Sequence, residues 1–393
     1  MYTQAKEIFA EVGIDTDAAI FALDDIPISL QCWQGDDFRG FEGVSSPVAG
    51  GINVAKSHPG RAKNAEELRT MLDDALKLIP GASKLNLHAM YGDVAGVNRD
   101  LIEPRDFNSW VDWAKERKLG LDLNPTMFAH KNASDGLTLS HPDKGIRDFW
   151  IEHARRCRKI AAYFGLSLGK LSVMNLWVPD GYKDIPADRL SPRRRLEDSL
   201  DEIFRDHYDP LCLLDAVESR PYSIGFEGFT TGSCEFYFGY AVKNGLSLSL
   251  GNFHTTESFA DKISAAALYV PRIRLHISRP VHRDSEHISL LGDELISVAR
   301  EIIRHGLLER VYIALDYADN TIDRATAWVI GARAMRKALL IALLEPYRAL
   351  QRAEESFDFT KRLVIMEEAK TLPWQAVWNE YCERKNMPTR LEF

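Results

Sequence analysis

The chain has 393 residues, of which 45% are hydrophobic and 27% charged; this excludes disordered, collagen-like and disulfide-scaffold proteins. Lys and Arg number 49 against 57 Asp and Glu, and the net charge of −8 argues against a nucleic-acid-binding face. Five dispersed cysteines without a CxxC pair fit free thiols in a reducing compartment. Because the sequence shows neither a signal peptide nor a run of 18 apolar residues, we expect a cytoplasmic protein without a membrane span.

Short apolar runs alternate along the chain with segments whose apolar residues recur at helical spacing, a pattern typical of βα units. The predicted strands are Pro27–Trp33, Leu85–Tyr91, Leu119–Asn124, Ser172–Val178, Leu213–Ser219, Leu246–Phe253, Ile273–Ser278 and Val311–Tyr317. The predicted helices between them include Ala65–Ile79, Ile146–Phe164, Glu197–Phe204, Thr256–Leu268 and Glu294–His305. Eight such strands predict a (β/α)₈ barrel. A doubly wound open sheet could hold as many, but the sequence has no GxGxxG or Walker A loop.

Helical segments are predicted on either side of the barrel. Residues 1–26 form a helical lead-in, residues 27–323 the barrel, and residues 324–393 its last helix with a C-terminal helical extension. In this extension we expect one long helix over Arg324–Glu354, followed by helices near Phe359–Ala369 and Trp374–Glu383. The sequence shows no repeat or linker, so we expect one domain with helical extensions.

Barrel enzymes carry their working groups at the C-terminal ends of the strands. The polar or aromatic candidates there are Trp33, Asp36, Asp37, His88, Asp122, Asn124, Asn175, Trp177, Asp180, Asp215, Glu218, Arg220, Asn252, His254, His276, Asp284, Glu286, Asp316 and Asp319. Carboxylates and histidines that converge on one barrel mouth repel each other unless a cation neutralises them, and this donor set suits Mn, Mg, Co or Zn. The spacing of Asp284 and Glu286 lets both chelate one ion from an extended loop.

Each candidate also has a structural interpretation. His88 could be a hydrogen-bonded core residue, and Trp33 and Trp177 could be core residues instead of sugar-stacking platforms. Glu218, His276 and Asp316 could form a salt-bridge network instead of holding a shared metal. Asp215 could pair with a neighbouring strand or helix. Six other histidines are predicted at the surface or in loops: His130, His141, His153, His282, His287 and His305.

Serine-hydrolase, zincin and kinase signatures are absent from the sequence. From the residues alone, the prediction is a metal-dependent barrel enzyme that acts on a small polar, sugar-like substrate.

Several long stretches carry a resemblance to a known family. They are Cys32–Asp37, Lys84–Ala89, Val173–Gly181, Leu214–Ser219, Asp261–Ala266, His276–Pro280 and Leu372–Trp378. Over about residues 7 to 385 the chain resembles the bacterial L-rhamnose isomerases. The resemblance implies a (β/α)₈ barrel, a homo-oligomer that is usually a tetramer, and a small sugar as the partner. It also implies up to two divalent ions per chain, commonly Mn²⁺, with Zn²⁺, Co²⁺ and Mg²⁺ as alternatives.

The resemblance assigns roles to particular positions. Glu218, His276 and Asp316 match three of the four ligands of the family's first metal. Asp284 and Glu286 match an Asp-x-Asp pair at the second metal, with Glu in place of the second Asp. Residues that match or lie in the substrate pocket are Trp33, His88 and Trp177.

Three positions depart from the family pattern. Ser249 stands where the first metal's Asp is expected, and Asn252 where the second metal's His is expected. An Asn carbonyl can still bind a metal, so Asn252 remains a predicted ligand, with His254 as a substitute. Arg220 replaces a Lys; it keeps the positive charge but cannot shuttle a proton.

The first hypothesis is a metal-dependent isomerase that interconverts L-rhamnose and L-rhamnulose. In it, Asp284 and Glu286 hold the catalytic ion or its water, and Arg220 stabilises charge on the substrate oxygens. The alternatives are an isomerase for a related aldose, or a metal-deficient homologue that acts as a sugar-binding protein or a non-catalytic oligomer partner.

Overall fold

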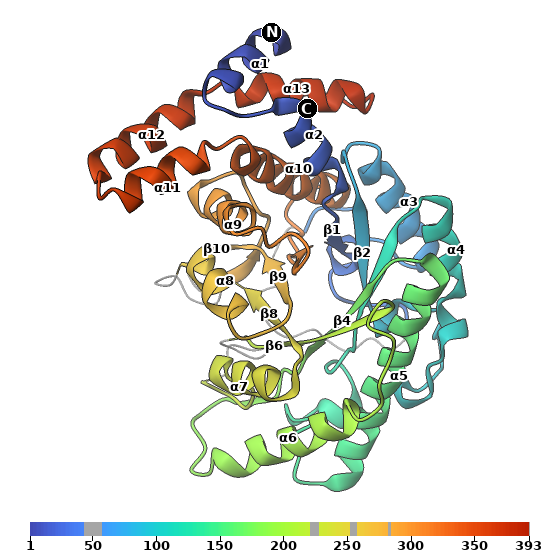
Figure 1. Cartoon of the computed structure of the whole chain (residues 1–393). Helices are drawn as coiled ribbons and strands as arrows, with labels where there is room; N and C mark the ends of the chain where they lie inside the picture. The colour runs from blue at the N-terminus through green and yellow to red at the C-terminus, as the bar shows by residue number, and fades with distance from the viewer. Residues whose placement is uncertain (43–56, 221–227, 252–257, 282–283, 393) are drawn as a thin grey trace.

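The computed structural model describes residues 1–42, 57–220, 228–251, 258–281 and 284–392 (Figure 1). Its strands are β1 (Ile28–Gln31), β2 (Ser83–His88), β3 (Gly120–Asn124), β4 (Ser172–Trp177), β5 (Gly181–Tyr182), β6 (Leu213–Glu218), β7 (Phe229–Thr230), β8 (Ser247–Gly251), β9 (Ile273–Ile277), β10 (Arg279–Val281), β11 (Asp284–His287) and β12 (Val311–Leu315). Its α-helices are α1 (Tyr2–Glu11), α2 (Thr16–Asp25), α3 (Ala65–Leu76), α4 (Asn108–Glu116), α5 (Lys144–Leu168), α6 (Leu190–Ile203), α7 (Cys234–Asn244), α8 (Phe259–Ala267), α9 (Asp293–Arg304), α10 (Arg324–Leu343), α11 (Tyr347–Glu355), α12 (Phe359–Thr371) and α13 (Trp374–Arg384).

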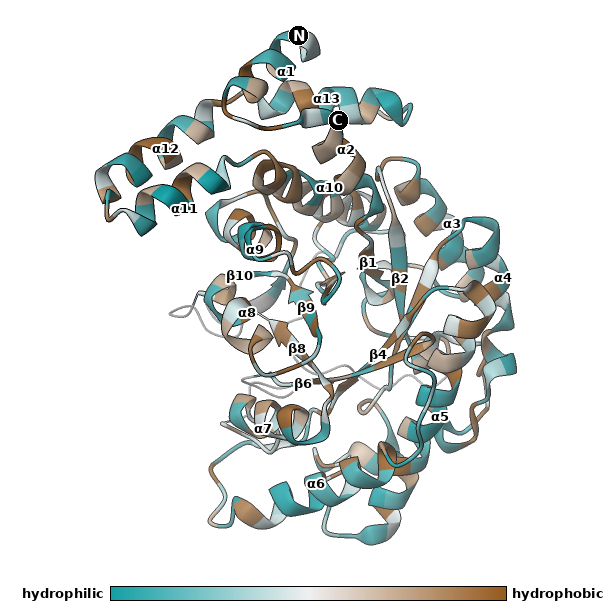
Figure 2. Cartoon of the chain, in the orientation of Figure 1, coloured by the Kyte–Doolittle hydropathy of each residue, from teal (hydrophilic) through white to brown (hydrophobic). Residues whose placement is uncertain are grey.

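Eight parallel strands close into a barrel in the order β1-β12-β9-β8-β6-β4-β3-β2. Seven of the predicted strands contain one of them, and the eighth, Leu85–Tyr91, overlaps β2 but starts two residues too late, so the predicted (β/α)₈ barrel is confirmed. Figure 2 shows brown, hydrophobic residues in the barrel strands, with pale and teal residues between them in β2 and β9. The apolar residues are in keeping with burial on both faces. Two short antiparallel pairs, β5 with β7 and β10 with β11, lie outside the barrel sheet. No helix in the described ranges is long and apolar enough to cross a membrane.

The predicted helix over Arg324–Glu354 is wrong, because the structure divides this segment into α10 and α11. Pro346 stands between the two helices and is the N-cap of α11. A proline in a helix interior removes a backbone hydrogen bond and clashes with the preceding turn, so the chain restarts its helix there. The α11–α12 hairpin then projects away from the barrel (Figure 1).

The end of β12 is fixed by close packing against α10. Tyr317 is 1% exposed, and its hydroxyl donates to the carbonyl of Ala327 over 2.9 Å. A Cβ on Gly331 of α10 would lie 2.1 Å from the Tyr317 hydroxyl oxygen, so only glycine leaves room for the ring. This packing holds the neighbouring residue, Asp316, at the barrel mouth.

His153 is a buried residue of α5, and the prediction that it lies at the surface or in a loop is wrong. Its Nε2 accepts from the Thr126 backbone N–H over 3.1 Å, and its Nδ1 lies 2.9 Å from the Arg99 carbonyl. Burial, assisted by the charge of Arg99, lowers the pKa of His153 to about 3. A second ring proton would meet the Thr126 N–H, so the fold requires the neutral ring.

We predict that His153 makes the protein less stable in acid. The unfolded chain takes up this proton near pH 6.5 and the folded chain only near pH 3, so stability falls as the pH drops through this window. His153→Gln keeps a donor and an acceptor but does not titrate. The slope of unfolding free energy against pH, from urea titrations between pH 6 and 4, should decrease by about 1.4 kcal/mol per pH unit.

The matched control is His207→Gln, which replaces an exposed histidine and should keep the wild-type slope. An unchanged slope in His153→Gln would contradict the prediction.

Candidate active site

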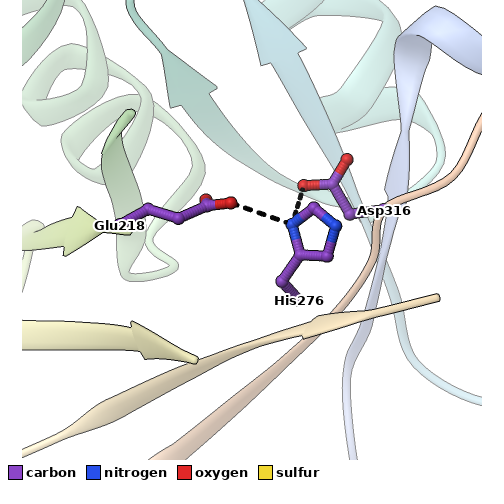
Figure 3. Close-up of side chains that lie close together, drawn as sticks. All are labelled: Glu218, His276 and Asp316. Atoms are coloured by element: carbon purple, nitrogen blue, oxygen red, sulfur yellow. Dashed lines mark ion pairs between the residues drawn. The ribbon is translucent and has the colours of Figure 1, made fainter. Parts of the chain in front are cut away.

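Three predicted metal ligands meet at the barrel mouth: Glu218 of β6, His276 of β9 and Asp316, which directly follows β12 (Figure 3). His276 Nδ1 lies 3.0 Å from Glu218 Oε1 and 2.7 Å from Asp316 Oδ2. All three side chains are buried, and their donor atoms lie within 4.8 Å of one another. Two carboxylates and one imidazole are a donor set that suits a divalent cation, so these residues could hold one ion.

Arg220 follows β6 and lies against the same three side chains. Its Nε is 3.2 Å from Glu218 Oε1, and one Nη lies 3.4 Å from both ring nitrogens of His276. Its other Nη is 2.8 Å from Glu286 Oε1. The guanidinium thereby connects the carboxylate of Glu286 in β11 to the three-residue cluster.

A second arginine, Arg274 in β9, lies beside the same carboxylates and was not among the predicted site residues. It is 1% exposed and lies 3.4 Å from Glu218 Oε2 and 3.6 Å from Asp316 Oδ2. The signal was available, because Arg274 and His276 alternate within an otherwise apolar strand and therefore share the inward face. A charged residue in an apolar strand, two positions before a candidate ligand, is expected to point into the barrel beside that ligand.

The charges in the cluster fix one another's protonation states. Burial favours neutral His276, but Asp316 and Glu218 outweigh it and raise the pKa of the imidazole to about 9. Burial also disfavours ionised Glu218 and Asp316, yet His276, Arg220 and Arg274 hold the pKa of both carboxyls well below the usual range. At neutral pH the metal-free cluster therefore contains ionised carboxylates and a protonated imidazole.

A row of side-chain amides orients the carboxylates. Asn124 donates to Asn86 Oδ1 over 2.6 Å, Asn175 donates to Asn124 Oδ1 over 2.9 Å, and the same Asn175 amide donates to Glu218. Gln31 of β1 donates to Asp316 Oδ1 over 3.0 Å. Each carboxylate is thus held by an amide on one side and by cations on the other.

An aromatic wall, which we define as Trp33, His88, Phe128 and Trp177, extends from the first strands to Arg220. Ring centroids are 4.3 Å apart for Trp33 and His88, 6.1 Å for His88 and Phe128, and 5.7 Å for Phe128 and Trp177. The Arg220 guanidinium lies 4.5 Å from the Trp177 ring centroid. Phe128 was not predicted, because it follows β3 in an irregular segment with no motif to mark it.

Burial lowers the pKa of His88 to about 3, so its ring is neutral at physiological pH. Within the described part of the chain, neither ring nitrogen of His88 nor the indole nitrogen of Trp33 has a hydrogen-bond partner. Buried polar atoms are usually hydrogen-bonded, so these three leave hydrogen-bonding capacity along the wall that a water molecule or a polar ligand can use.

Other candidate carboxylates are structural. Asp215 pairs with Arg158 of α5 at 2.8 Å, which confirms the simpler interpretation. Asp122 pairs with Lys84 below the cluster, Asp37 pairs with Arg324, and Asp180 accepts four hydrogen bonds from Thr138 and Ser140.

Some predicted site residues lie outside the described part of the structure. Asn252 and His254 fall in the range 252–257. Asp284 lies in β11, but its side chain is outside what the structure describes. Their predicted roles as ligands stay predictions.

We predict that the amide row contributes to stability. Asn124→Leu leaves the facing amide groups of Asn86 and Asn175 without this partner. Because an unsatisfied buried polar group costs about 1–3 kcal/mol, the free energy of unfolding should fall by about 2–4 kcal/mol in urea titrations.

The control is Asn244→Leu, at the exposed C-terminal end of α7, which should change stability by less than about 0.5 kcal/mol. If both variants lose the same small amount, the row does not stabilise the barrel.

Comparison with known proteins gives relatives over the whole chain. The sequence profile described as L-rhamnose isomerase (RhaA) matches residues 1–393. The L-rhamnose isomerases of Salmonella paratyphi B and Salmonella heidelberg are each 54% identical over 388 residues, covering 98% of this chain and 93% of theirs. Among solved structures, a D-allulose 3-epimerase from Methylomonas sp. superposes with a TM-score of 0.50 at 10% identity, covering 80% of this chain and 99% of that one.

The structural likeness at 10% identity supports the barrel fold alone. The profile match and the 54% identity extend over nearly the entire chain, including the strands that carry Glu218, His276 and Asp316. This chain belongs to the L-rhamnose isomerase family.

Proposed function

We propose that the protein is a metal-dependent aldose–ketose isomerase that interconverts L-rhamnose and L-rhamnulose. The observation that carries the proposal is the meeting of Glu218, His276 and Asp316 within 4.8 Å beside the aromatic wall. The family membership supports the sugar, since the relatives from two Salmonella strains are named L-rhamnose isomerase.

The three-residue cluster fits one divalent ion, for which we propose Mn²⁺, with Zn²⁺, Co²⁺ and Mg²⁺ as alternatives. Glu218, His276 and Asp316 would hold it. A bound ion supplies Lewis-acid polarisation of the sugar carbonyl. Because a metal ligand must be deprotonated, His276 has to lose the proton that its raised pKa retains, and Arg220 has to yield its contacts with the carboxylates.

The chain's own residues position the sugar. The rings of the aromatic wall offer apolar faces to the C–H groups of a pyranose. The neutral ring of His88 and the Trp33 indole N–H are available to sugar hydroxyls. Arg220 keeps its proton at any physiological pH, so its role is to stabilise negative charge on the substrate oxygens while hydrogen moves between C1 and C2.

Glu286 is the second carboxylate of the proposed machinery. Its Oε1 accepts from Arg220 over 2.8 Å, which places it next to the charge-stabilising guanidinium. We propose that Glu286 and Asp284 hold the second, catalytic ion or its water, and that Asn252 contributes an amide oxygen to this same ion.

A second candidate function has support from one observation. Two guanidiniums, of Arg220 and Arg274, lie against the carboxylates that would hold the metal. This arrangement favours a metal-deficient homologue that binds a sugar without converting it. An isomerase for a related aldose is compatible with the same site.

The test is L-rhamnulose formation from L-rhamnose with Mn²⁺ and with excess EDTA. We expect turnover with Mn²⁺ and its loss in EDTA. Asp316→Asn should lower kcat/KM by about 100-fold, because it removes a charged ligand, and the loss of a residue that only orients a ligand already costs about 10–100-fold. The control is Asp206→Asn, whose carboxylate pairs with Arg155 and is half exposed.

Folded protein without turnover on L-rhamnose, but with saturable sugar binding, would favour the sugar-binding alternative. Turnover of another aldose alone would replace the substrate while keeping the reaction.

We also propose that the chain forms a homotetramer in the cytoplasm. The side chains of Phe357, Phe359, Leu363 and Val364 on the α11–α12 hairpin are more than half exposed, and Figure 2 shows hydrophobic residues in α12. Exposed apolar clusters of this kind mark protein interfaces. All five cysteines are unpaired, which supports a reducing compartment.

We predict that light scattering after gel filtration gives four chain masses for the wild type and a smaller assembly for Leu363→Glu. The control is Leu166→Glu, at an exposed leucine of α5 that is remote in sequence from the hairpin. A monomeric wild type, or equal masses for both variants, would contradict this interface.

A further inference from the structure

We propose that Arg274 is a built-in cation of the site, which neutralises part of the charge of Glu218 and Asp316 and competes with a divalent ion for them. The inference concerns the metal cluster of the proposed function and therefore rests on it. In this proposal the chain binds its divalent ion weakly, because a guanidinium already lies on the inner side of the carboxylates of Glu218 and Asp316.

The position of Arg274 in the barrel puts its charge under the cluster. Arg274 and His276 are both inward-facing residues of β9, two positions apart, so the guanidinium lies one layer below the imidazole. Its Nη1 is 3.1 Å from Ser249 Oγ and 3.4 Å from Glu218 Oε2, and its Nη2 is 3.6 Å from Asp316 Oδ2. Arg220 lies against Glu218 and Asp316 as well, but its exposure is greater.

The surroundings of Arg274 show that its charge, more than its volume, is what the site uses. The interior of such barrels is normally filled with Val, Ile and Leu, and a buried cation is costly unless charges compensate it. Among the described residues, the ion pairs of Arg274 go to Glu218 and Asp316. Its Nη2 makes no hydrogen bond to any described residue. The contacts of this nitrogen with the carboxylates are therefore electrostatic and not hydrogen bonds.

Ser249 makes room for the guanidinium. It faces Arg274 in the register of β8 and β9 and Glu218 in the register of β6 and β8. Its side chain is fully buried and small, and its hydroxyl bonds the arginine without adding a charge. Ser249 thus leaves Glu218 and Asp316 as the anions that Arg274 must pair with.

Two consequences follow from a fixed positive charge at 3.4–3.6 Å from two prospective ligand oxygens. The carboxylates are held in place without any metal, so the cluster is formed before an ion enters. A divalent cation is also repelled by the positive charge of the guanidinium. The occupied and the metal-free states are therefore closer in free energy than in a site of carboxylates alone.

The experiment measures Mn²⁺ binding directly, by the electron paramagnetic resonance signal of free Mn²⁺ in titrations of the full-length protein. We expect Arg274→Met to lower the Kd for Mn²⁺ by about tenfold or more, because one close positive charge is removed. Arg274→Gln, which keeps a hydrogen-bonding group towards Ser249, should shift the Kd in the same direction. The control, Arg304→Met, removes a guanidinium paired with Glu345 outside the barrel and should leave the Kd unchanged.

Circular dichroism and thermal melting confirm that each variant is folded. A folded Arg274 variant with an unchanged or higher Kd would overturn the inference. Because the experiment measures Mn²⁺ binding, its outcome is independent of whether the protein is an isomerase. Tighter Mn²⁺ binding in both variants supports the inference even where L-rhamnose is not converted. Turnover by the wild type together with unaltered Mn²⁺ binding in the variants would overturn the inference and leave the isomerase standing.

Discussion

Pairing between buried carboxylates and buried cations is the constraint on which this site depends. Glu218 and Asp316 enter the barrel from different strands, and each would be costly there alone. Arg274 from below, Arg220 from the mouth and protonated His276 between them compensate that charge. The balance is reached without a metal, so any divalent ion must enter in competition with the protein's own cations.

The barrel makes this pairing possible because it brings residues far apart in sequence to one level of its axis. Glu218 and Asp316 are nearly a hundred positions apart, yet both lie within reach of one imidazole. The amide row from Asn86 to Glu218 crosses the strands with an offset. Asn86 faces Asp122 and Asn175 faces Ala216, so Asn124 and Glu218 each lie two residues beyond the register partner of the preceding member. Closure of the sheet thus determines which side chains meet, while α10 fixes the end of β12 through its packing on Tyr317.

The sequence allowed the barrel and its strands to be predicted because apolar runs report burial on both faces. The cluster of Glu218, His276 and Asp316 could also be proposed, because these residues stand at predicted strand ends and match metal ligands of the family. Pro346 was overlooked because the apolar periodicity continues on both sides of it. Arg274 and Phe128 were not predicted as site residues because neither belongs to a motif. Contacts between strands cannot be inferred from the pattern of one strand. His153 was misplaced because a histidine's two hydrogen-bond partners lie on other segments.

An ion pair and a larger charge cluster lie at different depths of the same barrel, and their composition shows why the pair is structural while the cluster can serve a reaction. Below, Asp122 pairs with Lys84 and also accepts from Ser29 and the Val173 backbone, while Lys84 donates to the Leu171 carbonyl. One negative charge is paired there with one positive charge, and the remaining hydrogen bonds of both side chains go to residues in or next to neighbouring strands. Above, the carboxylates of Glu218, Asp316 and Glu286 face two guanidiniums, and the proton on His276 completes the balance. A balance that depends on a removable proton and on a partly exposed Arg220 can change when a ligand arrives, whereas the lower one cannot.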